Sequence, residues 1–191
     1  MSEETVRQRF REHAEVAERL VESDLATVVD GVADAIVHAY REDHKLVLFG
    51  NGGSAADAAH TAAEFVGRYA RDRAALPAIA LGENVSSVTA ISNDYSFEHV
   101  FARQIEGLGA SGDVAIGIST SGSSANVVAG LEAARAKAMV TVGLTSGYGG
   151  AIAAVCDHCI CIPASETPRI QEGHILVLHV LCELVEQELF S

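Results

Sequence analysis

Short apolar runs alternate with helical patterns along most of this chain, and this alternation restricts the fold more than any other feature. Residues 1–43 contain two amphipathic helical stretches, and five short apolar runs follow, each separated from the next by a segment of helical pattern, at 46–49, 77–81, 114–118, 140–144 and 159–162. Short strands that alternate with helices form βαβ units, which build a parallel sheet covered on both faces. We therefore expect an α/β fold, a three-layer αβα sandwich around a five-stranded parallel sheet, with extra N-terminal helices.

One domain accounts for the whole sequence. Its 191 residues suffice for a single substantial core, and no repeat, low-complexity tract or Pro/Gly linker divides them. We expect a helical segment at 1–43 and an α/β core at 44–191. In open parallel sheets ligands bind beyond the carboxyl ends of the strands, so functional residues should follow the apolar runs.

Charge and composition exclude several classes of function. The net charge of −13 disfavours binding to nucleic-acid phosphates, and no apolar run is long enough to span a membrane. The charged segment 1–10 lacks the apolar stretch of a signal peptide, and the four cysteines form no evident disulfide pattern. We therefore expect a cytoplasmic protein. Because Lys45 and Lys137 are the only lysines, a phosphate site must rely on backbone N–H groups, hydroxyls and arginines.

Two polar loops follow apolar runs and precede helices. The first reads Gly50-Asn51-Gly52-Gly53-Ser54-Ala55. Its glycines let a backbone approach an anion, and a helix N-terminus supplies free N–H groups. A tight turn without a ligand is the alternative. A dinucleotide fingerprint fits poorly, because the acidic residue at the end of the second run, Glu83, lies much farther along the chain than such a site requires.

The second loop carries five hydroxyls around one glycine. It comprises Ser119, Thr120, Ser121, Gly122, Ser123 and Ser124. A helix N-cap would explain one of these hydroxyls but not all five. We therefore predict a phosphate cradle, and two cradles after two different strands indicate one extended polar ligand.

Two helical segments place titratable side chains on common faces. His60 and Glu64 are four residues apart, and Gln171 and His179 are separated by slightly more than two turns. These four side chains could chelate a metal or form an acid–base pair if the two helices meet. Taken singly, each has an ordinary explanation, such as a surface ion pair for the first two and a core histidine for His179.

Two further motifs have structural explanations of their own. Asn93-Asp94 interrupts a helical stretch, which an Asx turn would explain. The sequence Cys156-Asp157-His158-Cys159-Ile160-Cys161 invites a zinc interpretation, but no second pair of ligands accompanies it. We interpret these cysteines as small buried apolar residues.

Taken together, the segments resemble the sugar isomerase (SIS) domain family. The resemblance covers nearly the whole chain and rests on GNGGSAADAAH with AAEF, AISNDYSF, GDVAIGISTSGSSANV, GLTSGYGG and RIQEGHILVLH. Within the family, Glu64 and His179 mark the isomerase branch. That branch converts sedoheptulose 7-phosphate to D-glycero-D-manno-heptose 7-phosphate through an enediol, the first step of ADP- or GDP-heptose biosynthesis.

The resemblance also implies roles for individual residues and an assembly. Glu64 and His179 would transfer protons. One zinc ion per subunit would be held by His60, Glu64, Gln171 and His179. Substrate contacts would come from Asn51, Gly52, Gly53, Ser54, Glu64, Asn93, Asp94, Ser119, Thr120, Ser121, Ser124 and Gln171. The family forms homotetramers with active sites at subunit interfaces. The segment Ser165-Glu166-Thr167-Pro168 departs from members that carry an aspartate there.

Two other functions remain open at this stage. A related bacterial tetramer associates with the replication initiator protein and keeps the hydroxyl loop, but it lacks the carboxylate and histidine pair. A module that only senses sugar phosphates would likewise need the hydroxyl loop but not Glu64. The presence of Glu64 and His179 favours the isomerase.

Overall fold

The computed structural model describes residues 2–147 and 149–191, which form alternating helices and strands. In chain order these elements are α1 (Glu3–Glu22), α2 (Leu25–Arg41), β1 (Leu46–Gly50), α3 (Gly53–Val66), β2 (Ala78–Leu81), α4 (Val85–Asp94), the 3-10 turn η1 (Phe97–His99), α5 (Val100–Leu108), β3 (Val114–Ile118), α6 (Ala125–Ala136), β4 (Val140–Ser146), the 3-10 turn η2 (Gly150–Ala154), β5 (His158–Ile162) and α7 (Thr167–Leu189). The five strands are the five apolar runs of the sequence.

The sheet is fully parallel, and its strand order is β2-β1-β3-β4-β5. From β1 the chain moves outward to β2 and then returns past β1 to build the other half of the sheet. The order therefore reverses between β1 and β3, whose pairing begins at Leu46 and Val114. At such a point the loops after the two strands diverge and leave a crevice for a ligand. Both predicted cradles follow these two strands.

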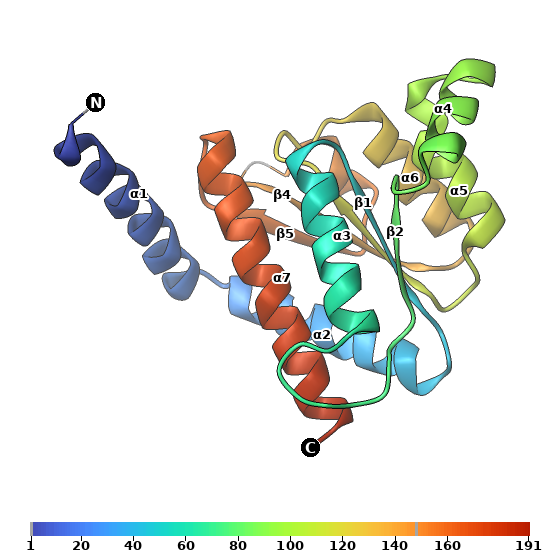
Figure 1. The fold of residues 1–191 in the computed structure, drawn as a ribbon, viewed down its shortest axis with the longest axis horizontal. Helices are drawn as coiled ribbons and strands as arrows, with labels where there is room; N and C mark the ends of the chain where they lie inside the picture. Colours follow the sequence, from blue (N-terminus) through green and yellow to red (C-terminus); the bar gives the residue numbers. More distant parts are fainter. Residues whose placement is uncertain (1, 148) are drawn as a thin grey trace.

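Each strand contributes alternate side chains to two cores. In β1, Leu46 and Leu48 pack with α2, α3 and α7, whereas Val47 and Phe49 pack with α5 and α6. All five residues of β1 are buried, as expected for a parallel strand covered on both faces. Figure 1 shows α3 and α7 side by side on one face of the sheet, with α5 and α6 on the other and α1 extending away from the core. The predicted three-layer architecture is confirmed.

Two local interpretations of the sequence are wrong. Asn93 and Asp94 do not interrupt a helix but form the last turn of α4, where the Asn93 amide donates to the Asp94 carboxylate at 2.8 Å. The cysteines of β5 and the turn before it are only half-buried, because β5 is an edge strand. Cys159 and Cys161 lie on the same strand face with their sulfurs 3.5 Å apart, and of the four cysteines Cys182 alone is fully buried.

Across the described segments, no helix combines the length and the apolar character that crossing a membrane requires.

Candidate active site

The loops after β1 and β3 are joined directly at the point where the strand order reverses. Asn51 follows β1, and Asn126 lies in the first turn of α6. Their side-chain amides exchange two hydrogen bonds, of 2.8 and 2.9 Å. Asn126 is 4% exposed, so this pair is a buried tie between the two loops. The sequence analysis did not identify Asn126, and its position just inside a helix after a serine-rich loop was the available signal.

The hydroxyls of the second loop converge on one another. Ser119 Oγ lies 2.8 Å from Ser124 Oγ and 3.3 Å from Ser121 Oγ, and Ser123 Oγ donates to Ser121 Oγ at 3.2 Å. Ser124 occupies the N-cap position of α6, yet its side chain makes no capping hydrogen bond. The hydroxyl of Ser124 therefore belongs to the cluster rather than to the helix. The helix N-terminus keeps backbone N–H groups for an anion, which favours the cradle over the capping alternative.

Gly122 allows this loop to turn tightly against its neighbours. Its φ of +65° lies in the left-handed region, and a Cβ there would lie 2.7 Å from Thr145 Oγ1 and closer still to the Gly149 carbonyl oxygen. The Gly122 carbonyl accepts a hydrogen bond of 3.0 Å from the backbone N–H of Ile152 in η2. The backbone path that groups the hydroxyls therefore requires glycine at this position.

His60 on α3 meets His179 on α7, 119 residues away. Their Nε2 atoms lie 2.9 Å apart, and His60 Nε2 is 3.5 Å from Glu64 Oε1. The ring of Tyr69 lies beside that of His179, with centroids 5.8 Å apart. His60 retains 47% and Glu64 24% of its side-chain exposure, so the cluster is open on its outer side. The two helices therefore meet at His60, which lies beside both Glu64 and His179.

Gln171 lies in the first turns of α7, whereas His60 and His179 lie near the middle of their helices. A Cβ on Gly53 would collide with Gln171 Nε2, so the amide covers the start of α3 beside the first cradle. Eight residues separate Gln171 from His179, which is about 12 Å along a helix. The contacts Gly53–Gln171 and His60–His179 show that α3 and α7 run parallel, as Figure 1 also shows. Gln171 therefore lies nearer the loop of Asn51 than the histidine pair.

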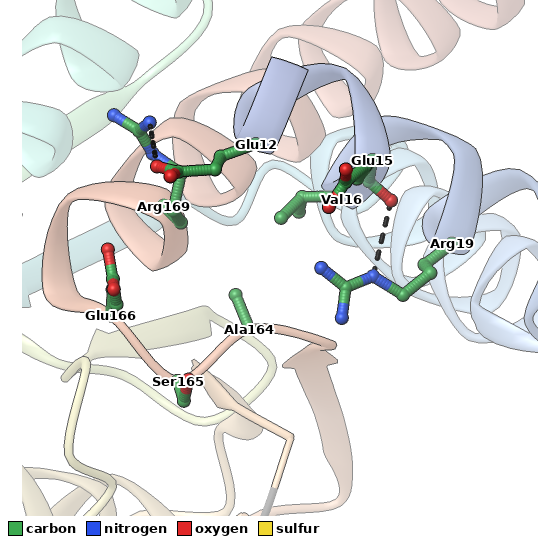
Figure 2. Close-up of a pocket in the computed structure, with 8 residues that line it drawn as sticks. All are labelled: Glu12, Glu15, Val16, Arg19, Ala164, Ser165, Glu166 and Arg169. Atoms are coloured by element: carbon green, nitrogen blue, oxygen red, sulfur yellow. Dashed lines mark hydrogen bonds and ion pairs between the residues drawn. The ribbon is translucent and has the colours of Figure 1, made fainter. Parts of the chain in front are cut away.

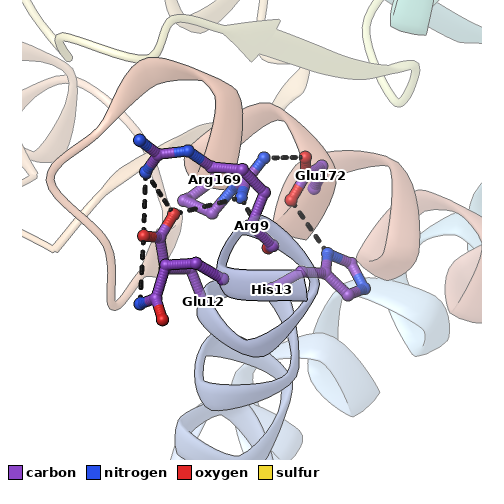
Figure 3. Close-up of polar contacts among 6 residues, drawn as sticks. Arg9, Glu12, His13, Arg169 and Glu172 are labelled. Carbon is purple, nitrogen blue, oxygen red and sulfur yellow. Dashed lines mark hydrogen bonds and ion pairs between the residues drawn. The ribbon is translucent and has the colours of Figure 1, made fainter. Parts of the chain in front are cut away.

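Helix α1 is fastened to the first turns of α7 close to Gln171. The Arg169 guanidinium donates to the Arg9 carbonyl oxygen at 2.9 Å and lies 3.5 Å from the Glu12 carboxylate. Glu172 pairs with Arg169 and also with His13, at 2.9 Å (Figure 3). These contacts fix where α1 leaves the core.

A hollow of about 210 Å³ lies beside this attachment, between α1 and the connection from β5 to α7. Figure 2 shows Arg19 and Arg169 on its walls together with Glu12, Glu15 and Glu166. None of the predicted site residues lines this hollow. Its charges are of both signs, so it has no clear preference for an anion or a cation.

Two predicted residues, Asn93 and Asp94, lie away from the cluster, and one residue that was not predicted, Asp57, lies beside it on α3. Asn93 and Asp94 are exposed at the end of α4, which Figure 1 shows beside α5 and α6, across the sheet from α7, so this chain alone does not bring them to the histidine pair. On α3, Asp57 precedes His60 by one turn, and burial raises its pKa while His60 lowers it. Among the described residues, Asp57 Oδ2 is buried and has no hydrogen-bond partner. Its i, i+3 spacing from His60 could have identified it.

The candidate metal ligands do not form a complete set within the described residues. Among the described residues, no group of three or more histidine, cysteine, aspartate or glutamate side chains meets the geometry of a metal site. Two nitrogens bound to one tetrahedral zinc ion lie roughly 3.3 Å apart, so the histidine pair at 2.9 Å needs only a small separation to fit. The nitrogen, nitrogen and carboxylate set is one that zinc accepts.

Comparisons with known proteins identify the family of the chain. The pattern described as the SIS domain matches residues 9–146. A phosphoheptose isomerase of Geobacter sp. (strain M21) is 49% identical over 187 residues, covering 98% of this chain and 97% of that protein. The solved phosphoheptose isomerase of Neisseria gonorrhoeae superposes with a TM-score of 0.90 at 41% identity, covering 96% of this chain and 98% of that one. The phosphoheptose isomerase of Francisella tularensis superposes with a TM-score of 0.93 at 30% identity, covering 98% of this chain and 100% of that one.

Proposed function

The chain belongs to the phosphoheptose isomerases of the SIS domain family, and we propose that it carries out their reaction at the cluster of His60, Glu64 and His179. The activity is that of a sedoheptulose 7-phosphate isomerase, an aldose–ketose isomerase of heptose biosynthesis. The single observation that supports this location most strongly is the meeting of His60 and His179 across α3 and α7, 2.9 Å apart and beside the Glu64 carboxylate.

The loop of Ser119, Thr120, Ser121 and Ser124 holds the phosphate in this proposal. The Ser119 hydroxyl already lies within hydrogen-bond distance of those of Ser121 and Ser124, and α6 begins directly after this loop with no side chain capping its N-terminus. Hydrogen bonds to a charged group stabilise by about 1.5–3 kcal/mol each. Asn51, Gly52, Gly53 and Ser54 at the start of α3 contact the sugar, and the Asn51–Asn126 tie fixes their loop relative to the phosphate loop.

Proton transfer falls to Glu64 and His179. The isomerisation removes a proton from C1 or C2 of the sugar and returns it to the other carbon through an enediol, which requires a positioned base and a positioned acid. Glu64 is the base at C1, and His179 moves the second proton. His60 lies between these two residues, with its Nε2 3.5 Å from Glu64 Oε1 and 2.9 Å from His179 Nε2. The phosphate loop orients C1 against Glu64.

Zinc is the metal that the side chains around this cluster fit. His60, Glu64 and His179 would hold it, and Gln171, whose amide covers the start of α3, would have to turn toward them to become the fourth ligand. When bound, it would polarise the carbonyl and hydroxyl oxygens of the sugar. If Glu64 acts as the base, either it would leave the metal during the reaction or the metal would serve mainly to order the site.

A homotetramer with sites at the subunit interfaces completes the proposal. His60 is exposed on its outer side, where a neighbouring subunit could cover the cluster. Asn93 and Asp94 lie away from the cluster of their own chain, so they could contribute to the site of a neighbouring subunit. An apolar groove of about 400 Å³ lies between α1, α2 and α7, and Val21 beside it is 85% exposed. Apolar surface of this kind is typical of subunit contacts.

Four free cysteines agree with a reducing cytoplasm.

Replacement of Glu64 by glutamine tests the assignment of the base. Glu64→Gln keeps the size of the side chain and removes its basicity, so turnover of sedoheptulose 7-phosphate should fall by about 10²–10⁴-fold. Exchange of the C1 hydrogen with deuterated solvent should fall in parallel. Glu132→Gln, an exposed change on α6, is the matched control and should alter neither rate. Exchange by the Glu64 variant at the wild-type rate would transfer the role of base to His179.

Elemental analysis tests the metal. Protein purified without chelator should contain zinc, and combined substitution of His60 and His179 by alanine should remove it, since both nitrogen ligands are lost. Full turnover in a metal-free preparation would leave the cluster as an acid and a base without zinc.

A further inference from the structure

A buried ion pair lies beside the proposed catalytic cluster, at the far end of the same two helices. Arg73 belongs to the loop between α3 and β2, and Glu186 lies in the last turns of α7, two turns beyond His179. Arg73 Nε donates to Glu186 Oε2 at 2.8 Å, and the two side chains are only 2% and 3% exposed. The reaction as proposed above uses neither residue.

The Glu186 carboxylate organises the loop that follows α3. Besides Arg73, it accepts hydrogen bonds from three consecutive backbone N–H groups: from Tyr69 at 3.1 Å, Ala70 at 2.9 Å and Arg71 at 2.8 Å. Burial alone would raise the pKa of Glu186, but these donors and the guanidinium outweigh it and hold the pKa below its usual value. The carboxylate is therefore charged and fully engaged at neutral pH.

The Arg73 guanidinium holds the end of α3. It donates to the carbonyl oxygen of Glu64 at 2.8 Å and to that of Phe65 at 2.9 Å. These carbonyls lie in the last turn of the helix, where no intrahelical partner exists. The arginine therefore fixes the backbone of Glu64 itself.

Stability alone gives little reason for such a pair. Burying two charges costs several kcal/mol per ion, and well-packed apolar residues at such positions are often equally stabilising. What an apolar pair cannot do is satisfy three N–H groups and two carbonyls at once, and so fix an irregular loop against two helix ends. The loop fixed in this way carries Tyr69, whose ring lies beside that of His179.

We propose that Arg73 and Glu186 are positioning residues of the isomerase, which hold the backbone of Glu64 and place Tyr69 against His179. This inference rests on the proposed function, because Glu64 and His179 are the groups whose geometry it protects. A misplacement of about 1 Å can cost on the order of 100-fold in rate without removing any catalytic group.

The test compares Glu186→Gln with Glu188→Gln, a matched change two residues away on the same helix. Glu188 pairs with Arg41 on the surface, where both side chains are more than half exposed. Glu186→Gln should lower kcat by about 10–100-fold while KM for sedoheptulose 7-phosphate stays within about threefold, because the phosphate loop is untouched. Hydrogen–deuterium exchange at Tyr69, Ala70 and Arg71 should accelerate. Glu188→Gln should change none of these values.

The outcomes separate the inference from the proposed function. Unchanged kcat in a folded Glu186→Gln protein would overturn the inference even where the wild type is an active isomerase. If that variant fails to fold, Arg73→Lys is the second test, because it keeps the charge but loses the planar guanidinium. This variant should fold normally and have a lower kcat. An unaltered kcat would refute the positioning role. A wild type without turnover would overturn the proposed function, and equal exchange in wild type and Glu186→Gln would overturn the positioning of the loop.

Discussion

Gly122 is the position where one methyl group should damage the phosphate loop most. Alanine at its φ of +65° costs about 1–2 kcal/mol of backbone strain. The added carbon would also lie 2.7 Å from Thr145 Oγ1 and closer still to the carbonyl oxygen of Gly149. Overpacking of this kind costs about 1–3 kcal/mol more. Gly122→Ala should therefore lose about 2–5 kcal/mol of unfolding free energy.

Gly52→Ala is the control for stability, because it isolates the backbone cost. Gly52 has a φ of +56°, and a Cβ there would meet no heavy atom within 4 Å. Its ψ of −120° places this backbone in a region that glycine alone adopts readily, so the variant should lose about 1–3 kcal/mol in urea unfolding, from backbone strain without a close contact. Equal losses for the two variants would refute the close-approach argument.

The same change at Gly122 should weaken phosphate binding. Relief of the contact with Gly149 moves the loop, which separates Ser124 from Ser119, now 2.8 Å apart at their hydroxyls. Loss of one hydrogen bond to a charged group costs about 1.5–3 kcal/mol, or roughly 10–150-fold in affinity. Calorimetric titration with sedoheptulose 7-phosphate measures this loss. Wild-type affinity in a destabilised Gly122→Ala protein would show that the loop does not bind the phosphate.

Two further predictions concern pH and assembly. His174 is fully buried, and its Nε2 donates to the Thr145 carbonyl oxygen. Burial lowers the pKa of His174 from 6.5 to about 4. The unfolded chain therefore binds this proton at a higher pH than the folded protein does, and the free energy of unfolding should fall by about 3 kcal/mol as the pH drops from 6.5 toward 4. In urea unfolding, His174→Gln should show a flatter pH dependence. An unchanged dependence would contradict the assignment to His174. Light scattering should find an oligomer that Val21→Lys dissociates, because Val21 is 85% exposed beside an apolar groove, and a monomeric wild type at micromolar concentration would contradict the proposed assembly.

Much of this protein follows from local patterns in its sequence. The five apolar runs form the five strands, because a run of four or five apolar residues between helices can bury all its side chains in a sheet that is covered on both faces. The two polar loops followed β1 and β3 as predicted, since glycines and hydroxyls mark the ends of these strands. The i, i+4 spacing of His60 and Glu64 likewise predicted their contact at 3.5 Å.

Local patterns failed where the environment of a residue depends on the edges and ends of elements. The cysteines at 159 and 161 were predicted to be buried, but β5 lies at the edge of the sheet and leaves them half-exposed. Asn93 and Asp94 continue α4 to its last turn, because a helix end is set by the chain that follows and not by residue preferences alone.

Only the tertiary structure decided which distant groups meet. His60 contacts His179, Asn51 pairs with Asn126, and Glu186 binds the loop at 69–73, at sequence separations of 75 to 119. Periodicity shows which face of a helix is buried, but it does not show which neighbour lies beside that helix or in what register. Those relations come from the strand order and from the packing of α3 against α7, which depend on the summed contacts of the whole core.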